Sequence, residues 1–238
     1  MKLALIGYGK MGKEIEKIAL SRGHEISLII DIDNQEDLTS ENLSECDVAI
    51  EFTIPESSVK NYFKCFEAGI PVVSGTTGWL SQKEEVLKKC EETNGTFFYE
   101  SNFSVGVNLF FELNKKLAEL MSSHPEYDPQ ITEVHHVHKL DAPSGTAIKL
   151  AEDMTGILQG KDKWTDKKEA RKNELPVKSK REGTVVGTHT IKYDSKVDYI
   201  EITHSAKSRQ GLALGAVLAA EYCIGKKGIL NMKDLLKI

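Results

Sequence analysis

The sequence predicts an α/β fold in which a doubly wound parallel sheet is joined to a central α+β domain. Two observations predict the sheet. Short apolar runs alternate with helical patterns over residues 2–99, and a glycine-rich turn joins the first run to the first helix. After about Val107 this alternation stops, which predicts a second domain. Hydrophobic residues make up 40% of the chain and charged residues 28%, as is ordinary for a globular protein.

The first elements read as a βαβ unit. Lys2–Ile6 is a short apolar run typical of a buried strand. A helical pattern then continues to about Arg22, where Gly23 is suited to end it. Glu25–Ile30 is the second strand, and Asp31 stands at its end. Further strands are expected at Asp47–Phe52, Ile70–Ser74 and Thr96–Tyr99, with helices at Ser57–Ala68 and Ser81–Thr93.

Two details of this first half concern local structure. Ser81 and Glu84 have the spacing of a capping box and predict the start of the second of these helices. A loop is expected at the carboxyl end of each strand. Ligands of doubly wound sheets bind at such loops.

The second half contains longer helices and a β-rich region. Helices are expected at Asn108–Met121, Ser144–Leu158 and Gly211–Ile224, and Ser144 is a plausible N-cap. Gln130–His138 is β-rich, and Thr184–Tyr193 pairs with Tyr199–His204 as a hairpin. Lys161–Arg181 holds nine basic and four acidic residues, which predicts a solvated loop.

The glycine turn has the context of a dinucleotide site. Gly7-x-Gly-x-x-Gly12 follows a strand and opens a helix, and Asp31 stands 19 residues after Gly12. The glycines allow a tight turn and a close approach of a pyrophosphate, and the helix N-terminus favours its charge. Asp31 would accept hydrogen bonds from the ribose. A ligand-free glycine turn is the alternative, and the combination of all these features favours the nucleotide.

Asp31 also bears on the choice of cofactor. A carboxylate repels a 2′-phosphate unless a basic residue compensates, and residues 32–34 contain none. Lys10 in the glycine turn is the one candidate. NADH therefore looks at least as acceptable as NADPH. Thr76 and Thr77 lie at a strand exit, where a role in binding nicotinamide and a purely local capping role stay equally open.

The segment Glu133–Ala147 is the densest in reactive groups, with three histidines, a lysine, two carboxylates and a Pro-Ser-Gly-Thr corner. On an ideal strand His135 and Lys139 share one face, and His136 and His138 share the other. Such groups fit acid–base chemistry on an anionic substrate. Paired histidines are also zinc ligands, but no cysteine lies near in sequence, and no metal is expected.

The same segment resembles the signature E-x-H-H-x-x-K-x-D-A-P-S-G-T-A of the dihydrodipicolinate reductase family. The resemblance extends over nearly the whole chain through segments that fall in the family's order: Gly75–Gly78, Ser101–Asn108, Val186–His189, Ile200–His204 and Ser208–Arg209. Two departures stand out. The glycine turn is one residue shorter than in many members, and Thr188 stands where many have Glu.

The resemblance implies reduction by NADH or NADPH, giving tetrahydrodipicolinate and water in the diaminopimelate route of lysine biosynthesis. It makes His135 the acid/base and Lys139 the proton donor. The resemblance and the helix start together assign the cyclic dicarboxylate to His136, Ser144, Gly145 and Thr146. The implied cofactor-binding residues are Gly7, Tyr8, Gly9, Lys10, Met11, Gly12, Asp31, Gly75, Thr76, Thr77, Glu100, Ser101, Asn102 and Phe103.

The resemblance also implies the organisation of the chain. Residues 1–106 and 212–238 would form the dinucleotide-binding domain, and residues 107–211 the substrate-binding domain that builds a homotetramer. Net charge is −5, so no nucleic-acid partner is expected. No apolar run approaches the roughly 18 residues of a membrane span, and no signal-peptide pattern opens the sequence, so the cytoplasm is expected.

Two other functions remain to be separated. A semialdehyde or homoserine-type dehydrogenase could use a related nucleotide domain, and its semialdehyde version needs a cysteine nucleophile. The four cysteines are widely scattered, and neither Cys65 nor Cys90 lies in a segment typical of a reactive thiol. A non-enzymatic dinucleotide sensor would explain the N-terminal half and leave the histidine-rich segment without a role.

Overall fold

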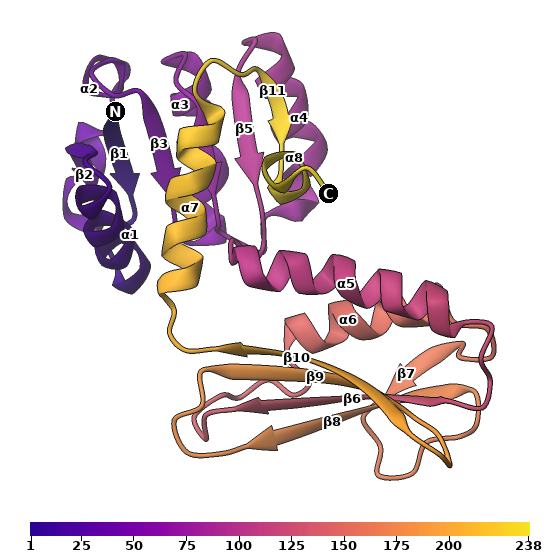
Figure 1. Ribbon diagram of the computed structural model, residues 1–238. Helices are drawn as coiled ribbons and strands as arrows, with labels where there is room; N and C mark the ends of the chain where they lie inside the picture. The colour runs from indigo at the N-terminus through magenta and orange to yellow at the C-terminus, as the bar shows by residue number, and fades with distance from the viewer. The chain divides into compact units, whose positions relative to one another are not determined.

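The computed structural model describes all 238 residues, which form two compact units. Unit 1 comprises residues 1–105 and 210–238, and unit 2 comprises residues 106–209. Figure 1 shows the C-terminal helix and strand of unit 1, in yellow, beside strands from the N-terminal half. Each unit has its own hydrophobic core.

Unit 1 is built on a six-stranded parallel sheet, which confirms the predicted doubly wound architecture. The strand order is β11-β5-β4-β3-β1-β2. The order reverses between β1 and β3, and ligands bind at such a switch point in this class of sheet. The strands are β1 (Lys2–Ile6), β2 (Glu25–Ile30), β3 (Val48–Glu51), β4 (Val72–Ser74), β5 (Thr96–Tyr99) and β11 (Gly228–Leu230).

Helices cover both faces of this sheet. α3 (Pro55–Glu67) and α4 (Lys83–Glu92) pack on one face, and α1 (Lys10–Ser21) and α7 (Gln210–Cys223) pack on the other. Small residues let α7 approach closely, because a Cβ at Gly215 would lie 1.7 Å from the carbonyl oxygen of Phe103. The remaining helical turns are η1 (Ile32–Asp37), α2 (Ser40–Ser44), η2 (Leu80–Gln82) and α8 (Met232–Leu236).

Unit 2 has an α+β fold. Its sheet has five strands in the order β10-β9-β6-β8-β7. α5 (Val105–Met121) and α6 (Gly145–Thr155) lie on the same face of this sheet (Figure 1). The core between the layers combines residues of both helices with Ile131, Val177 and Ile191 of the sheet. The strands are β6 (Asp128–His135), β7 (Lys163–Thr165), β8 (Glu174–Arg181), β9 (Gly187–Asp194) and β10 (Tyr199–Ala206).

The prediction of a solvated loop over Lys161–Arg181 is wrong. This segment contains β7 and β8, and β8 pairs in parallel with β6. Leu175 and Val177 are buried in the core of unit 2, whereas Lys178 and Lys180, which follow them, are exposed. The many charges hid this short apolar alternation, which is the pattern of a strand with one buried face.

Four predicted boundaries also need correction. α3 begins at Pro55 and not at Ser57, in keeping with the preference of proline for the first helical position. The capping box of Ser81 and Glu84 does not form, because residues 80–82 make a 3₁₀ turn and α4 starts at Lys83. α5 starts at Val105 rather than Asn108, and β6 ends at His135 rather than His138.

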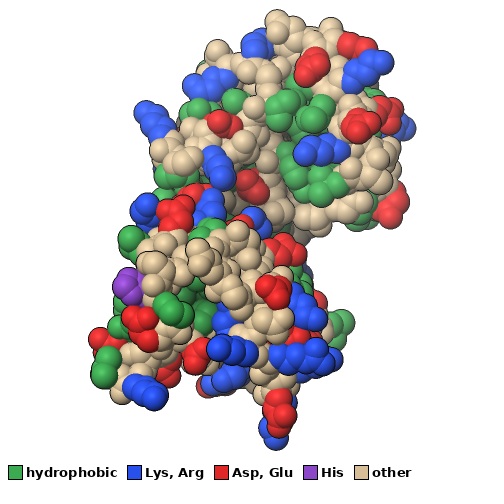
Figure 2. Space-filling view, turned by 90° about the vertical axis from the view of Figure 1, so that its right-hand side faces the viewer, with side chains coloured by type: hydrophobic (Ala, Val, Ile, Leu, Met, Phe, Trp, Pro, Cys, Tyr) green, Lys and Arg blue, Asp and Glu red, His purple; other side chains and the backbone are tan.

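The surface mixes both signs of charge. On the face that Figure 2 shows, Lys and Arg are interspersed with Asp and Glu, and a patch of hydrophobic side chains lies among them. Neither unit contains a helix with the length and apolar character that crossing a bilayer would require.

Candidate active site

Unit 1 has a groove at the carboxyl ends of β1, β3 and β4. Its volume is about 500 Å³, and three loops line it: Gly9–Met11, Phe52–Pro55 and Gly75–Thr77. These segments follow β1, β3 and β4, and β1 and β3 flank the switch point. The groove therefore lies where a doubly wound sheet binds its ligand.

The three glycines of the turn have different surroundings. Gly7 has φ +94°, and a Cβ there would lie 2.1 Å from the carbonyl oxygen of Phe52. A Cβ at Gly12 would lie 2.3 Å from the carbonyl oxygen of Gly7. Gly9 lines the groove, and nothing lies within 4 Å of the position of its absent Cβ. Gly7 and Gly12 are thus needed for the turn itself, whereas Gly9 leaves room that suits a pyrophosphate.

The groove gathers six of the residues predicted to bind the cofactor: Gly9, Lys10, Met11, Gly75, Thr76 and Thr77. Tyr8, Asp31 and the segment 100–103 are not among its lining residues. The Tyr8 hydroxyl donates a hydrogen bond to Glu16 on α1, and Phe103 is buried against Phe98 in the core.

Sequence reasoning did not assign the loop Phe52–Pro55 to the groove. The signal was present, because this loop follows β3 in the same way that Gly75–Thr77 follows β4. The rule that ligands lie beyond the carboxyl ends of the strands predicts both loops equally.

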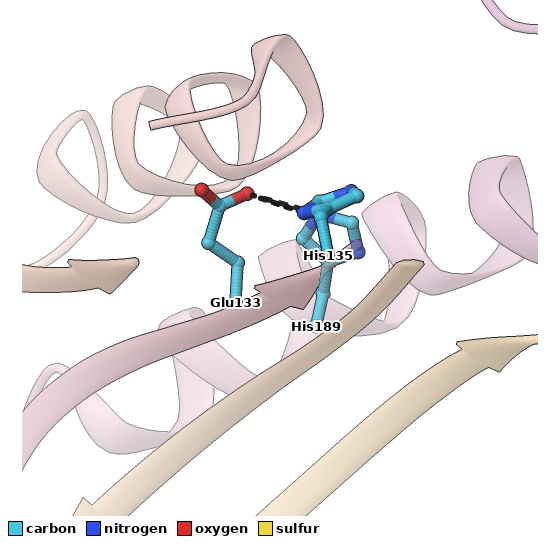
Figure 3. A group of neighbouring side chains, drawn as sticks. All are labelled: Glu133, His135 and His189. Carbon is cyan, nitrogen blue, oxygen red and sulfur yellow. Dashed lines mark ion pairs between the residues drawn. The ribbon is translucent and has the colours of Figure 1, made fainter. Parts of the chain in front are cut away.

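Unit 2 brings Glu133, His135 and His189 together. Glu133 and His135 stand two residues apart on β6 and therefore point to the same side of the sheet. The antiparallel pairing of β6 with β9 places His189 directly opposite Glu133. Figure 3 shows the three side chains converging, with a dashed line between Glu133 and His135. Oε2 of Glu133 lies 3.2 Å from Nδ1 of His135 and 3.8 Å from Nε2 of His189.

Glu133 is completely buried and has several donors. The backbone N–H of Ser144 donates to its two oxygens at 3.1 and 3.2 Å, and the Arg181 guanidinium lies 3.3 Å away. Burial alone would raise the pKa of Glu133, but hydrogen bonds from Ser144 and Ser179 and the nearby His135 outweigh it and lower the pKa. Glu133 is therefore a buried carboxylate that stays ionised near neutral pH.

The two histidines are held in the neutral form. Burial lowers the pKa of His135, and the Glu133 carboxylate offsets this only in part. Burial lowers the pKa of His189 to about 4, and the neighbouring His135 adds to the shift. The two imidazole rings meet edge to face with centroids 5.1 Å apart. A neutral His135 can accept a proton near pH 7 or act as a donor only after it has gained one.

Ser144 joins this cluster to the start of α6, and its predicted role as N-cap is confirmed. Its Oγ accepts a hydrogen bond from the N–H of Ala147 and lies 3.1 Å from Nε2 of His189. The first N–H groups of a helix have no acceptor inside it, which here concerns Gly145 and Thr146. Open space surrounds Gly145, so this helix start is suited to an anion.

Lys139 does not share a strand face with His135, because β6 ends between them. Lys139 lies in the turn that follows and forms an ion pair with Asp141 at 2.8 Å. The Arg181 side chain donates hydrogen bonds to the carbonyl oxygens of both residues. Arg181 therefore links the Lys139 turn to Glu133. His136 and His138 stand next to each other in the same turn, with ring centroids 6.3 Å apart.

Glu133, His135 and His189 also satisfy the distance requirement for a metal site, since their ligand atoms lie within 4.8 Å of one another. This set differs from the neighbouring histidines that the sequence offered as ligands. The Arg181 cation on the same carboxylate opposes a second positive charge there. We therefore treat the set as an ion-paired network, and the expectation of no metal stays a prediction.

A nucleotide-type groove on a doubly wound sheet, together with a separate histidine and lysine cluster, defines a two-domain oxidoreductase. The family model "Dihydrodipicolinate reductase, N-terminus" matches residues 1–103, and "Dihydrodipicolinate reductase, C-terminus" matches residues 106–236. The chain belongs to the dihydrodipicolinate reductase family.

Individual relatives agree with this assignment. The chain is 50% identical to the 4-hydroxy-tetrahydrodipicolinate reductase of Christiangramia forsetii over 99% of this chain and 98% of the relative. It is 35% identical to the enzyme of the same name from Neisseria gonorrhoeae, over 93% of this chain and 83% of the relative. A solved dipicolinate-bound dihydrodipicolinate reductase from Paenisporosarcina sp. TG-14 has the same fold, with a TM-score of 0.77, 23% identity and 97% of each chain covered. The predicted family and the predicted class, an oxidoreductase of the lysine pathway, are confirmed.

Proposed function

We propose that this protein reduces 4-hydroxy-tetrahydrodipicolinate with NADH or NADPH, giving tetrahydrodipicolinate and water. The observation that carries the proposal is the joint presence of a switch-point groove in unit 1 and the Glu133–His135–His189 cluster beside α6 in unit 2. The 50% identity to a reductase of this name over nearly the full length supports the same substrate. Because such metabolites are small and water-soluble, we expect the enzyme to work in the cytoplasm.

The nicotinamide cofactor would supply a hydride. Gly9 leaves space for its pyrophosphate, and the loops Phe52–Pro55 and Gly75–Thr77 would hold the nicotinamide half. We propose that both NADH and NADPH are accepted, with NADH preferred, because Asp31 directly follows β2 and no basic residue stands in the next three positions. A paired titration with the two cofactors, read as two dissociation constants, tests this preference.

The substrate carries two carboxylates, and the groups around α6 are suited to bind them. The N–H groups of Gly145 and Thr146 and the Thr146 hydroxyl would hold one carboxylate, and His136 the other. Ser144 would fix the helix start, since it is bonded both to Ala147 and to the Glu133 network. The Lys139 ammonium would add positive charge beside the ring.

Loss of the 4-hydroxyl group as water gives a conjugated imine, and hydride addition to that imine leaves electron density that a proton must neutralise. Lys139 is the better proton donor of the two candidates, because its ion pair with Asp141 requires an ammonium group. His135 is kept neutral by burial, so it can act as a base that accepts a proton and releases it again during turnover. The Glu133 carboxylate beside Nδ1 would stabilise His135 when it becomes charged.

The two rival functions make different demands. A semialdehyde dehydrogenase needs a reactive thiolate, yet all four cysteines are buried. Burial raises the pKa of Cys90 to about 11 and that of Cys223 to about 12, and it also raises those of Cys46 and Cys65. Thiols of this kind are poor nucleophiles. A dinucleotide sensor would leave the Glu133 network without a use.

One assay separates the three functions. NADH oxidation is followed with the cyclic substrate generated in place from pyruvate and aspartate semialdehyde. Rapid oxidation that requires both precursors is the expected result. Oxidation of NADH with aspartate semialdehyde alone would favour the homoserine-type enzyme, and reduction of NAD⁺ by aspartate semialdehyde would favour the semialdehyde enzyme. Binding of NADH without any oxidation would favour the sensor.

We further propose that the enzyme is a homotetramer built through unit 2. The sheet face opposite α5 and α6 carries paired hydroxyl groups, Thr188 with Ser205 at 2.8 Å and Thr190 with Thr203 at 3.0 Å. Short side chains of this kind form a flat surface on which a second sheet can pack. Light scattering after size-exclusion chromatography should give about four times the chain mass of 26.5 kDa.

A further inference from the structure

Glu51, the last residue of β3, is buried completely beneath the groove of unit 1. Three hydroxyl groups donate to its carboxylate: Thr53 to Oε1, and Ser74 and Thr76 to Oε2 at 2.8 and 2.9 Å. No lysine, arginine or histidine forms an ion pair with it. A carboxylate buried without a cation is costly, so its retention at this position calls for an explanation.

The neighbouring hydrogen bonds fix the direction of this network. The backbone N–H of Thr53 donates to Oγ1 of Thr76 at 2.8 Å, and the Thr76 hydroxyl in turn donates to Glu51. The Ser74 hydroxyl also donates to Glu51, so the Tyr62 hydroxyl, 2.7 Å away, must donate to Ser74. Every chain of donors ends at the two oxygens of the Glu51 carboxyl group.

This arrangement ties together the two loops that sequence reasoning treated separately. Thr53 belongs to the loop after β3 and Thr76 to the loop after β4, and both line the groove. Thr76 is nearly fully buried, and its carbonyl oxygen accepts a hydrogen bond from the Trp79 indole at 2.9 Å. Its hydroxyl is thus occupied within the protein, and a ligand in the groove would meet Thr77 and the loop backbone.

We infer that Glu51 is a positioning residue for the cofactor: it holds the loops 52–55 and 75–77 in the spacing that binds the nicotinamide dinucleotide, without touching it. The inference rests on the proposed function of the groove. Glu51→Gln would place an amide N–H₂ among groups that donate, so one loop must move away. Binding of NADH must then restore the loop spacing and leave the amide N–H₂ group without an acceptor. The dissociation constant for NADH should therefore rise about tenfold.

Direct binding of NADH, followed by calorimetry on the full chain, tests the inference without turnover. The set comprises wild type, Glu51→Gln, Glu51→Asp, Thr76→Val and the double variant Glu51→Gln with Thr76→Val. Glu174→Gln is the matched control, because it makes the same change at another buried carboxylate, on β8 of unit 2. We expect losses for Glu51→Gln and Thr76→Val that do not add in the double variant, partial recovery with Glu51→Asp, and no loss in the control.

Steady-state kinetics distinguishes positioning from a general effect on folding. Positioning raises KM for the cofactor about tenfold and changes kcat at saturating cofactor less than twofold. A purely structural role would lower kcat with the folded fraction and leave the dissociation constant unchanged, and that result would overturn the inference. Wild-type affinity in Thr76→Val would overturn it too, even if Glu51→Gln fails to fold. A wild-type protein that binds neither NADH nor NADPH would overturn the proposed function itself.

Discussion

Glu51 in unit 1 and Glu133 in unit 2 are both completely buried, yet their surroundings act on them in opposite directions. Glu51 is surrounded by neutral hydroxyls, and burial raises its pKa despite the hydrogen bonds that it accepts. For Glu133 the same effect of burial is outweighed by the hydrogen bonds from Ser144 and Ser179 and by His135, so its pKa falls. An arginine also stands beside it.

The difference fits the proposed function, in which the two sites have different tasks. In the groove of unit 1, the protein needs fixed loop positions for a cofactor that brings its own reactive atoms. In unit 2, the protein needs charges that support proton transfer on an anionic substrate. Burial of a carboxylate is common to both sites, and its partners distinguish the positioning role that we propose for Glu51 from the chemical role that we propose for Glu133.

Lys139→Ala should have the largest effect. It should lower kcat, which depends on unit 2, and leave NADH binding in unit 1 unchanged. Loss of a proton donor lowers kcat by about 10²–10⁴-fold. The dissociation constant for NADH should stay within about twofold, because Lys139 belongs to unit 2 and the groove is lined only by unit 1. Stopped-flow turnover and NADH calorimetry on the same sample measure both quantities. Equal losses in the two would argue against a role in proton donation.

Glu133→Gln removes the feature that distinguishes the two carboxylates. It leaves Arg181 without its partner and replaces an acceptor for the Ser144 N–H. We expect the free energy of unfolding to fall by about 3 kcal/mol, as for other broken buried ion pairs. Urea denaturation monitored in unit 2 measures the loss. A change below about 0.5 kcal/mol, the usual range for a surface substitution, would mean that the network contributes little.

Acidification should change the stability of the two units in opposite directions: unit 2 should lose stability and unit 1 should gain it. The folded pKa of His189 is about 4 against an ordinary value of 6.5. Between these values the unfolded state binds more protons, so unit 2 loses up to about 3 kcal/mol as the pH falls. The folded pKa of Glu51 is raised, so there the folded state binds the proton first and unit 1 gains stability.

Hydrogen exchange resolved by segment measures this divergence, after correction for the intrinsic effect of pH. Amides of β6 and β9 should lose protection between pH 6.5 and about 4, whereas amides of β3 and β4 should not. His189→Gln serves as the control that removes the titrating group. Equal loss in both units would contradict the comparison.

Gly9→Ala should have the smallest effect, and this effect should be on NADH binding in unit 1. Its Cβ would meet no protein atom within 4 Å, so the melting temperature should not change. The methyl group would enter the space assigned to the pyrophosphate, and we expect the NADH dissociation constant to rise about tenfold, equal to about 1.4 kcal/mol. Gly7→Ala is the contrast, because its Cβ would clash with Phe52 and lower stability as well. Unchanged NADH affinity in Gly9→Ala would argue against this place for the pyrophosphate.

Local patterns were sufficient to predict much of this molecule. The glycine turn, the alternation that follows it and the N-cap at Ser144 depend on neighbours in sequence, and all three occur as predicted. The pairing of Glu133 with His189 could not be predicted, because it depends on the register between β6 and β9, which are far apart in the chain. Arg181 was hidden for a related reason, since it stands at the end of a strand that its many charges disguised.

Unit 1 is made of two segments that are separated in the chain by the whole of unit 2. Its last strand, β11, and the helix α7 are both within residues 210–238. Until those residues emerge, the sheet face that includes Leu3 and Ile50 is covered by α1 and lacks α7, the second helix that packs on it. Unit 2 is complete earlier, because its residues are contiguous. Unit 2 therefore has all of its residues before unit 1 does, and part of one sheet face of unit 1 stays uncovered until residues 210–238 are made.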